Sequence, residues 1–366
     1  MLIKYFNIFI FIFIRFISFS QVPKYSNDFL SIGVGARAIG MSNATVSVVD
    51  DVTAGYWNPA GLSRIEQDRQ ISLMHNEYFA GIAKYDYGAI AAKIGTTGVA
   101  SFSFIRVGID DIPNTLYMID SDGNFNYNKI TSFSAINYGF LLSYGHANQK
   151  IKGLRYGATM KVVHNQAGDF ASSWGFGIDI GLQYEHNNWM FGFTGRDITT
   201  TFNAWSYNFN DADKAQLSLL GNSVPENSLE ITLPRLIFGI ARKINITKKI
   251  SCMPVVEADV TTDGKRNVLI SSNPFSVDLH AGMELGYNHI IFLRCGIGNF
   301  QYETNNSNKK FLSSQLNMGI GINIKKNISI DYTLTDLGDH SIALYSNVFS
   351  LKLSFNKPKH KTKYLF

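Results

Sequence analysis

The sequence predicts an all-β fold, a transmembrane antiparallel up-and-down β-barrel of about 14 strands with an N-terminal hatch segment. Three observations lead to this prediction. Apolar and polar residues alternate with period two from about residue 69 onward, short and long connections alternate between these segments, and only 17% of the 366 residues are charged. Because soluble domains carry about 25% charged residues, this composition favours a protein with a large lipid-facing surface.

The alternation gives each expected strand one apolar and one polar face. In residues 174–184 every even position is apolar or aromatic, while the odd positions hold Gly, Asp or Gln. A soluble sandwich would bury the apolar face against a second sheet, whereas a membrane barrel turns it towards lipid and keeps the polar face inside. Aromatic residues at the ends of the apolar faces favour the barrel, because such residues mark the membrane interface: Trp174 and Tyr184, Tyr138 and Tyr144, and Phe349 and Phe355.

The lengths of the connections decide between these two architectures. We expect strands at 69–78, 84–94, 98–107, 132–146, 153–166, 171–185, 189–198, 231–244, 249–260, 277–287, 290–298, 311–325, 328–334 and 341–355. Every second connection is short, and the others include the long loops 108–131, 199–230, 261–276 and 299–310. Short turns on one side and long loops on the other are typical of an outer-membrane barrel. An even strand number then places both termini in the periplasm.

Residues 1–20 have the features of a cleaved secretory signal peptide. They contain a basic residue at Lys4, an apolar run over 6–14, and small residues at Ser18 and Ser20 before the expected cut. A transmembrane anchor is the alternative, but a basic residue interrupts the apolar run before it is long enough to span a bilayer. The sequence therefore predicts export to the cell outer membrane.

Three further segments follow from this organisation. Residues 21–64 are expected to form the hatch, residues 65–355 the barrel, and residues 356–366 a basic periplasmic tail. A tail of this charge is suited to contact phospholipid headgroups, so outer-membrane lipid is an expected partner.

The composition gives little support to other kinds of function. A formal net charge of +5 is too small to suggest a nucleic-acid partner. Eight scattered histidines lack the spacing of a metal site, and no catalytic constellation follows from the residue spacings. We therefore predict a non-enzymatic protein with no catalytic residues, no metal and no cofactor. His280, Asp278 and Glu284 share one lumen-facing strip, which indicates a polar lumen; a ligand or hydrolase site there is the alternative.

The two cysteines are expected to be free thiols. Cys252 and Cys295 both fall on the lipid face of their strands, with one strand between them. Positions two strands apart are separated by about 9–10 Å, which exceeds the reach of a disulfide.

The segment from Gly33 to Gly61 connects the leader to the first strand. Its glycines suggest a phosphate-binding loop, but Met41 stands where such a loop needs Lys and Ser or Thr. We predict instead a plug inside the lumen, whose glycines allow tight turns in a confined space. Within it, we expect Asp50 and Asp51 to point apart and to cap a turn, Asn58-Pro59 to form a rigid turn, and Trp57 to wedge against the wall. The hatch and gating candidates are Arg37, Asp50, Asp51, Trp57, Asn58, Pro59, Ala60 and Gly61; Arg37 is expected to pair with Asp179 or Glu284.

Both ends of the chain resemble one family of bacterial barrels. The residues Gly35-Ala-Arg-Ala-Ile-Gly-Met41, Asp50-Asp51 and Tyr56-Trp-Asn-Pro-Ala-Gly-Leu62 look like the N-terminal signature of the PorV/PorQ family of Bacteroidota, a branch of the FadL-like barrels. Asp331-Tyr-Thr-Leu-Thr-Asp-Leu-Gly338 is similar to that family's last hairpin. The resemblance implies an outer-membrane component of the type IX secretion system, with the translocon and the C-terminal sorting domains of cargo proteins as partners.

Two functional hypotheses follow. In the first, the loops 108–131 and 199–230 contact cargo or the translocon, and the second loop supplies an aromatic cluster typical of an interface core. In the alternative, the barrel is a FadL-like channel for hydrophobic small molecules, which requires an apolar pocket beside the hatch, whereas the lumen-facing residues considered are mostly polar or Gly. The partner-contact loop candidates are Phe202, Trp205, Tyr207 and Phe209.

Overall fold

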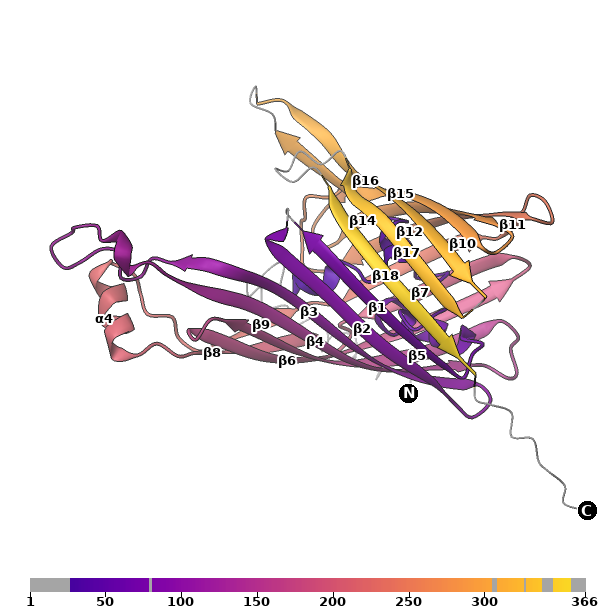
Figure 1. Ribbon diagram of the computed structural model, residues 1–366, viewed down its shortest axis with the longest axis horizontal. Helices are drawn as coiled ribbons and strands as arrows, with labels where there is room; N and C mark the ends of the chain where they lie inside the picture. Colours follow the sequence, from indigo (N-terminus) through magenta and orange to yellow (C-terminus); the bar gives the residue numbers. More distant parts are fainter. Residues whose placement is uncertain (1–26, 79–80, 305–307, 326, 338–344, 357–366) are drawn as a thin grey trace, which may run out of the picture.

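The computed structural model describes residues 27–78, 81–304, 308–325, 327–337 and 345–356, which form a closed β-barrel around an N-terminal hatch (Figure 1). The strands are β1 (Arg69–Tyr78), β2 (Ala83–Ile94), β3 (Gly98–Asn114), β4 (Thr131–Ala147), β5 (Leu154–Ala167), β6 (Ala171–His186), β7 (Trp189–Arg196), β8 (Thr201–Tyr207), β9 (Ser228–Thr232), β10 (Arg235–Arg242), β11 (Ile244–Asn245), β12 (Ile250–Thr261), β13 (Ile270–Ser271), β14 (Ser276–Tyr287), β15 (Ile291–Thr304), β16 (Lys310–Ile324), β17 (Ile328–Leu337) and β18 (Ser346–Phe355).

The first and last strands close the sheet. β1 pairs antiparallel with β2 on one side and with β18 on the other. β7 and β8 both pair with β6 as two parts of one long strand, and β9 and β10 form the next strand in the same way. Counted as continuous strands, the closed barrel has the fourteen strands that the sequence predicts. Closure pairs the backbone groups that a bilayer cannot hydrate.

The outer face of the barrel is apolar, as the alternation predicts. Along β1, for example, Leu73 is 51% exposed while its neighbour Met74 is 4% exposed and faces the lumen. Trp174 and Phe349 remain exposed at the ends of their apolar faces, and the Trp174 ring stacks on His164 with a centroid distance of 4.2 Å. These large exposed side chains suit a lipid environment, with aromatic residues near the interfaces.

The inner face is rich in glycines that the hatch main chain approaches closely. A Cβ atom added to Gly157 would lie 2.6 Å from the Pro59 carbonyl carbon, and one added to Gly282 would lie 2.7 Å from the Met41 carbonyl oxygen. The polar-face glycines therefore serve as contact points for the plug. A side chain at such a position would force the hatch away from the wall.

Two predicted loops contain more regular structure than expected. β3 continues to Asn114, seven residues past its expected end, whereas β4 begins at Thr131, within one residue of its expected start, and residues 115–130 remain a connection between the two strands. The expected loop 199–230 contains β8, the helix α4 (Asp211–Leu219) and the beginning of β9. The strands extend past the apolar band because sheet pairing continues between neighbouring strands beyond it. Figure 1 shows the β3–β4 hairpin and α4 projecting together from one end of the barrel.

Several smaller predictions differ from the structure or lie outside it. β15 and β17 extend beyond their expected ends, to Thr304 and Leu337. The signal peptide at 1–20 and residues 21–26 of the expected hatch fall outside the described residues, as does the tail beyond Asn356. No helix in the described part of the chain is long and apolar enough to cross a membrane.

The prediction of free thiols is confirmed. Neither Cys252 nor Cys295 forms a disulfide. β14 separates the two strands that carry them, because Cys252 pairs with Leu285 and Cys295 pairs with Met283.

Substituting an inner glycine should weaken the packing of the hatch. In Gly181→Val the new side chain would collide with Asn58 and Pro59, and overpacking of this kind costs about 1–3 kcal/mol. We expect a lower urea midpoint for unfolding of the barrel in lipid vesicles, followed by tryptophan fluorescence. The matched control is Gly88→Val, whose Cβ meets only Leu73 Cδ2 at 3.6 Å. Equal losses in the two variants would contradict the role assigned to the inner glycines.

Candidate functional site

The hatch is the candidate functional site. Its described part begins at Asn27 and folds as short helices joined by tight turns, namely η1 (Asp28–Ser31), α2 (Ala36–Ile39), α3 (Ala54–Trp57) and η2 (Pro59–Arg64). The turns use conformations that favour glycine, since Gly33 and Gly35 have φ angles of 104° and 84°. Each helix is only one or two turns long, so contacts with the wall must hold the segment in place.

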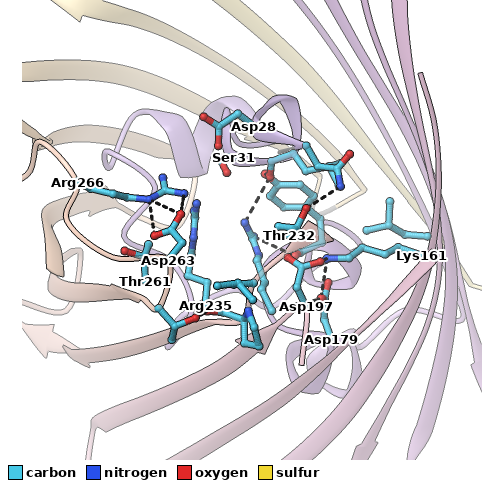
Figure 2. A pocket seen from close by; sticks show the side chains of 18 residues that line it. Asp28, Ser31, Lys161, Asp179, Asp197, Thr232, Arg235, Thr261, Asp263 and Arg266 are labelled. Carbon is cyan, nitrogen blue, oxygen red and sulfur yellow. Dashed lines mark hydrogen bonds and ion pairs between the residues drawn. The ribbon is translucent and has the colours of Figure 1, made fainter. Parts of the chain in front are cut away.

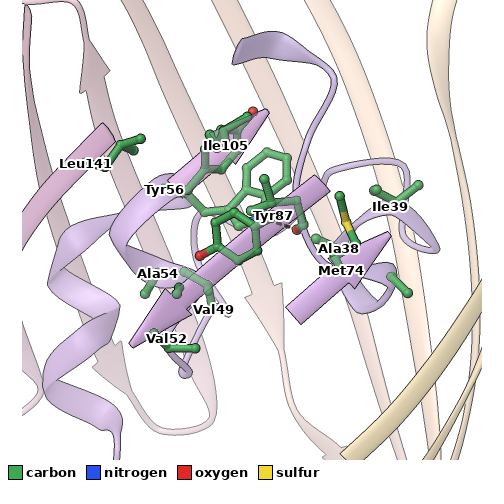
Figure 3. Close-up of a cluster of buried hydrophobic side chains, with 14 of the residues drawn as sticks. Ala38, Ile39, Val49, Val52, Ala54, Tyr56, Met74, Tyr87, Ile105 and Leu141 are labelled. Carbon is green, nitrogen blue, oxygen red and sulfur yellow. Dashed lines mark hydrogen bonds between the residues drawn. The ribbon is translucent and has the colours of Figure 1, made fainter. Parts of the chain in front are cut away.

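One side of the hatch packs on an apolar part of the inner wall. Val52 and Tyr56 of the hatch lie in one buried cluster with wall residues such as Tyr87 and Ile105 (Figure 3). We call the wall part of this cluster the apolar strip; it comprises Met74, Tyr85, Tyr87, Ile105, Val107, Leu141 and Val163. The expectation of a mostly polar lumen is therefore wrong for this side. The strands with the clearest polar faces, such as β6, β14 and β16, belong to other parts of the wall.

Asn58 fastens the hatch to the wall on the side of β6 and β7. It is fully buried, and its Nδ2 donates to the carbonyl oxygens of Val46 (2.9 Å), Leu182 (3.0 Å) and Phe193 (3.3 Å). Its Oδ1 accepts from the Ala60 amide at 3.2 Å, which caps η2 at Pro59. The predicted rigid turn is therefore present, and it also joins the plug to two neighbouring strands. Ala60 and Gly61 are buried behind it.

Charged residues hold the opposite side of the hatch. Arg37 pairs with Asp50 (2.7 Å) and with Glu284 of β14 (2.9 Å), as one of the two predicted pairings requires. Glu284 also pairs with Arg294 (2.7 Å), which in turn contacts Asp331 at 2.6 Å. This chain of alternating charges crosses from the plug to three wall strands. Buried pairs of this kind need complete partners, because a lone buried charge is costly.

The two adjacent carboxylates point apart, as predicted. Asp50 contacts Arg37, whereas Asp51 accepts from the Thr53 amide at 3.0 Å and pairs with Lys352 of β18 at 2.9 Å. Asp51 thus caps a turn of the hatch. The other candidate partner of Arg37, Asp179, instead contacts Lys161 at 2.8 Å.

Trp57 is buried between the hatch and the wall residue Arg196. Its Nε1 donates to the Val34 carbonyl oxygen at 2.9 Å, and its ring packs edge-on against Tyr56. The guanidinium of Arg196, from the end of β7, lies 4.6 Å from the Tyr56 ring centroid and 5.4 Å from that of Trp57. Cation–π contacts and packing within the hatch therefore immobilise the tryptophan.

Several residues of this site were not among those predicted from the sequence. Glu257 of β12 is buried and accepts from the hatch amides of Thr45 and Val46, both at 2.8 Å. Arg196 and Lys161 are also buried on the inner face. The available signal was a charged residue at an inward position of an alternating strand. Sequence alone does not say which of these face the plug and which face open lumen.

The hatch lies between two cavities. An outer cavity of ≈590 Å³ opens towards the long loops and includes Ser31, Asn43 and Trp57 of the hatch in its lining. An inner cavity of ≈290 Å³ lies towards the short turns and is lined by Arg37, Asp50 and other polar groups. Passage from one to the other along the barrel axis thus requires the hatch to move.

The wall itself is interrupted beside the hatch. The ladder between the seventh and eighth strands breaks at residues 197–200 and 233–234. Lys161 of β5 reaches the edge of this interruption and contacts Asp179 (2.8 Å) and Asp197 (2.7 Å), while the Asp197 amide donates to Asp179 at 2.8 Å. Figure 2 shows these side chains around a small pocket of ≈40 Å³ between the interruption and η1. These contacts hold Asp197, the first residue of the interruption, to β5 and β6.

Three of the four aromatic loop candidates lie on a strand. Phe202, Trp205 and Tyr207 belong to β8, whereas Phe209 lies in the short connection 208–210 before α4. Trp205, Tyr207 and Phe209 form a stack with ring centroids 6.4 and 6.5 Å apart, whereas Phe202 points to the opposite face and is 46% exposed. Strand periodicity separates the four residues into two faces.

Comparison with known proteins finds the same fold among solved structures. No family model and no curated protein matches the chain. Among solved structures, it is similar to the CymD monoaromatic hydrocarbon channel (12% identity, 89% of this chain and 98% of that chain, TM-score 0.55). It is also similar to the Ralstonia pickettii toluene transporter TbuX (14%, 88% and 99%, 0.54) and to a Pseudomonas aeruginosa FadL homologue (11%, 88% and 98%, 0.52). The fold is that of the FadL-like barrels. At these identities the likeness concerns the fold.

The described residues give no support to a metal site. None of their His, Cys, Asp and Glu side chains gather in groups of three that would hold an ion. His280 contacts Asp278 at 3.5 Å, and Glu284, the third residue of the predicted strip, is bound to Arg37 and Arg294.

Acid should loosen the charged side of the hatch. Burial opposes ionisation of Asp50, but attraction by Arg37, Arg64 and Lys352 outweighs it and holds the pKa of Asp50 well below its usual range. Because folding lowers this pKa, the ion pair stabilises the folded state when the pH is above the unfolded pKa of about 3.9. This contribution is progressively lost as the pH falls below that value. We expect the ionic conductance of the barrel in planar bilayers to stay constant from about pH 7 to 5 and to rise below about pH 4.

Two variants check this assignment. Asp50→Asn should conduct more than the parent already at neutral pH and should lose the acid response. Asp120→Asn, in the loop after β3, removes another carboxylate whose pKa is lowered, mainly by hydrogen bonds from Asn124, and should behave as the parent does. A conductance rise near pH 6 would contradict the role of Asp50.

Proposed function

We propose that this chain is a non-enzymatic outer-membrane channel for small hydrophobic molecules, closed at rest by its hatch. The observation that carries the proposal is the apolar strip on the inner wall. A water-filled pore has a polar interior, whereas here Tyr87, Ile105 and Leu141 present an apolar surface under the hatch. Displacement of the hatch would expose this strip along the lumen.

The strip offers a physical reason for selectivity. Apolar solutes gain about 25 cal/mol for each Å² that they remove from water, so they would adsorb where the hatch had been. Polar solutes gain nothing from the same surface. The hatch is also tied to the rest of the wall, through Arg37 to β14, Asp51 to β18 and Asn58 to β6 and β7. It can move only by breaking these contacts.

The interruption between the seventh and eighth strands fits the same function. A hydrophobic molecule leaving the lumen prefers lipid to water, and a break in the ladder is a suitable place for it to cross the wall. The break lies beside η1 and Tyr56 at the edge of the hatch. Lys161 with its two aspartates would have to be displaced for passage.

The structural comparisons support this proposal in one respect. CymD is described as a monoaromatic hydrocarbon channel and TbuX as a toluene transporter, and both share the barrel fold with this chain. We extend to this chain the general class of hydrophobic solute. The short turns would then face the periplasm and the long loops the cell exterior, with both termini periplasmic.

A reversible cross-link between hatch and wall tests the channel. A Cβ atom at Gly239 would lie 3.3 Å from Ser47 Oγ, which is close enough for a disulfide between Ser47→Cys and Gly239→Cys. The native Cys252 and Cys295 are first replaced by Ser. We expect oxidised cells that carry the double-cysteine variant to take up radiolabelled toluene no faster than cells without the protein, and reduction to restore uptake.

The controls are the two single-cysteine variants, which should transport under both conditions. Full uptake by the oxidised, cross-linked protein would show that the hatch need not move and would overturn the gating proposal. Absence of toluene uptake by the parent, in cells where the barrel is folded in the outer membrane, would overturn the hydrophobic channel itself.

A second candidate function is a docking role in type IX secretion, as the resemblance to the PorV/PorQ family suggests. The observation that favours it is the tip of the β3–β4 projection, where Phe125 is 61% and Tyr127 is 70% exposed. Exposed aromatic side chains on a projection are typical of protein interfaces. The expected partners are the type IX translocon and the sorting domains of its cargo.

Substitution of the tip tests this second function. Phe125→Ser combined with Tyr127→Ser should abolish co-purification of sorting-domain cargo with the intact barrel from native outer membranes. Tyr287→Ser, which removes a 48% exposed ring at the opposite end of the barrel, is the control. Unchanged co-purification of cargo with the tip variant would contradict the docking role. It would not affect the channel proposal, which has its own test.

A further inference from the structure

A groove in the projecting part of the barrel has the chemistry of a saccharide site. It is a cavity of ≈680 Å³ above the turn between β5 and β6. The β3–β4 hairpin bounds it on one side, and the segment from Asn208 to α4 bounds it on the other. The β3–β4 hairpin and α4 lie at the left of Figure 1. The groove lies beyond Trp174, outside the apolar band of the barrel.

The groove is held open by a rigid frame. The Tyr117 hydroxyl donates to Asp213 Oδ1 at 2.6 Å, and Gln216 Nε2 donates to the Ile119 carbonyl oxygen at 2.7 Å. These two bonds join α4 to the loop after β3. Asn210 caps α4 by accepting from the Asp213 amide at 2.9 Å. A site preformed in this way loses little conformational entropy when a ligand binds.

Three aromatic rings contribute to its lining. Phe133 packs edge-on against Phe170 with a centroid distance of 5.6 Å, and Phe170 stacks on Phe209 at 5.7 Å. All three rings are half-buried and line the groove. Apolar ring surface in an aqueous groove is unfavourable unless something covers it.

Polar but mostly uncharged side chains surround these rings. Gln166, Asn208 and Asn210 supply amides, and Thr131 and Ser132 supply hydroxyl groups. Asp169 and Asp213 are the charged residues in the lining, and none of the residues that line it is basic. The outer and inner cavities, by contrast, both contain arginines. Phosphates and other anions therefore have no counter-charge in this groove.

We propose that this groove binds a neutral saccharide unit of a cell-surface or soluble glycan. One face of a pyranose ring consists of C–H groups, which pack on aromatic rings and make weak favourable contacts with their π-faces. Its hydroxyl groups both donate and accept, which matches amides and carboxylates. Rings flanked by Asn, Gln and Asp therefore complement a sugar better than they complement an anionic lipid or a nucleic acid.

Calorimetric titration of the intact barrel in nanodiscs tests the proposal. The probes are maltoheptaose as a soluble neutral glycan and the delipidated O-polysaccharide of the host lipopolysaccharide as the cell-surface source. We expect at least one of them to bind, and we expect Phe209→Ala to weaken binding by about tenfold, which corresponds to about 1.4 kcal/mol. Asn208→Ala, at an exposed position with little effect on folding, should also weaken it.

The matched control is Phe202→Ala, which removes a ring of the same kind from the opposite face of β8. Binding should be unchanged in that variant. Binding of O-polysaccharide alone would identify lipopolysaccharide as the source, and binding of maltoheptaose would identify soluble glycans.

The proposal is overturned if neither probe binds at about millimolar concentration, or if Phe202→Ala weakens binding as much as Phe209→Ala. Preference for polygalacturonate, an acidic glycan, would overturn the neutral class. If the parent captured a protein that the Phe209→Ala variant did not, and neither glycan bound, the groove would be a protein-binding site and the proposal would be overturned.

Discussion

Close approach between the hatch main chain and the inner wall is the constraint on which the rest of the structure depends. Glycines in several wall strands leave room for backbone at Met41, Ser47 and Pro59. A side chain at these positions would push the plug into the lumen and separate it from both its apolar and its charged partners. The plug has helices of only a few residues, so its conformation comes from the wall that surrounds it.

The lumen is divided into two physically different sides. Contacts with the apolar strip are non-directional, so the hatch can slide over it. The ion pairs of Arg37 and the hydrogen bonds of the Asn58 side-chain amide are directional and require particular positions. A hatch held in this way can be released from its directional contacts while it remains in contact with the strip. This combination is what the proposed movement of the hatch requires.

Much of the fold could be predicted from the sequence, because strand alternation and the sorting of connection lengths are local signals. The divergence of Asp50 and Asp51 was also predicted, and the structure bears it out. For Arg37 the sequence left two partners open, Asp179 and Glu284, and the structure shows Glu284. The extent of the projecting hairpins was not predicted. Pairing of strands outside the membrane depends on the neighbouring strands. Aromatic residues such as Phe202 and Trp205 occur both in loops and on strands, so their presence does not distinguish the two.

The sequence by itself determined the barrel, its strand number, the presence of a plug and the inward face of each strand. These properties follow from periodicity and from the requirement that lipid meets only apolar side chains. Only the tertiary structure decided that the plug covers an apolar strip, that the wall breaks beside Lys161, and that Phe133, Phe170 and Phe209 meet in one groove. Each of these depends on side chains from strands distant in sequence, and their juxtaposition is set by the register around the closed sheet.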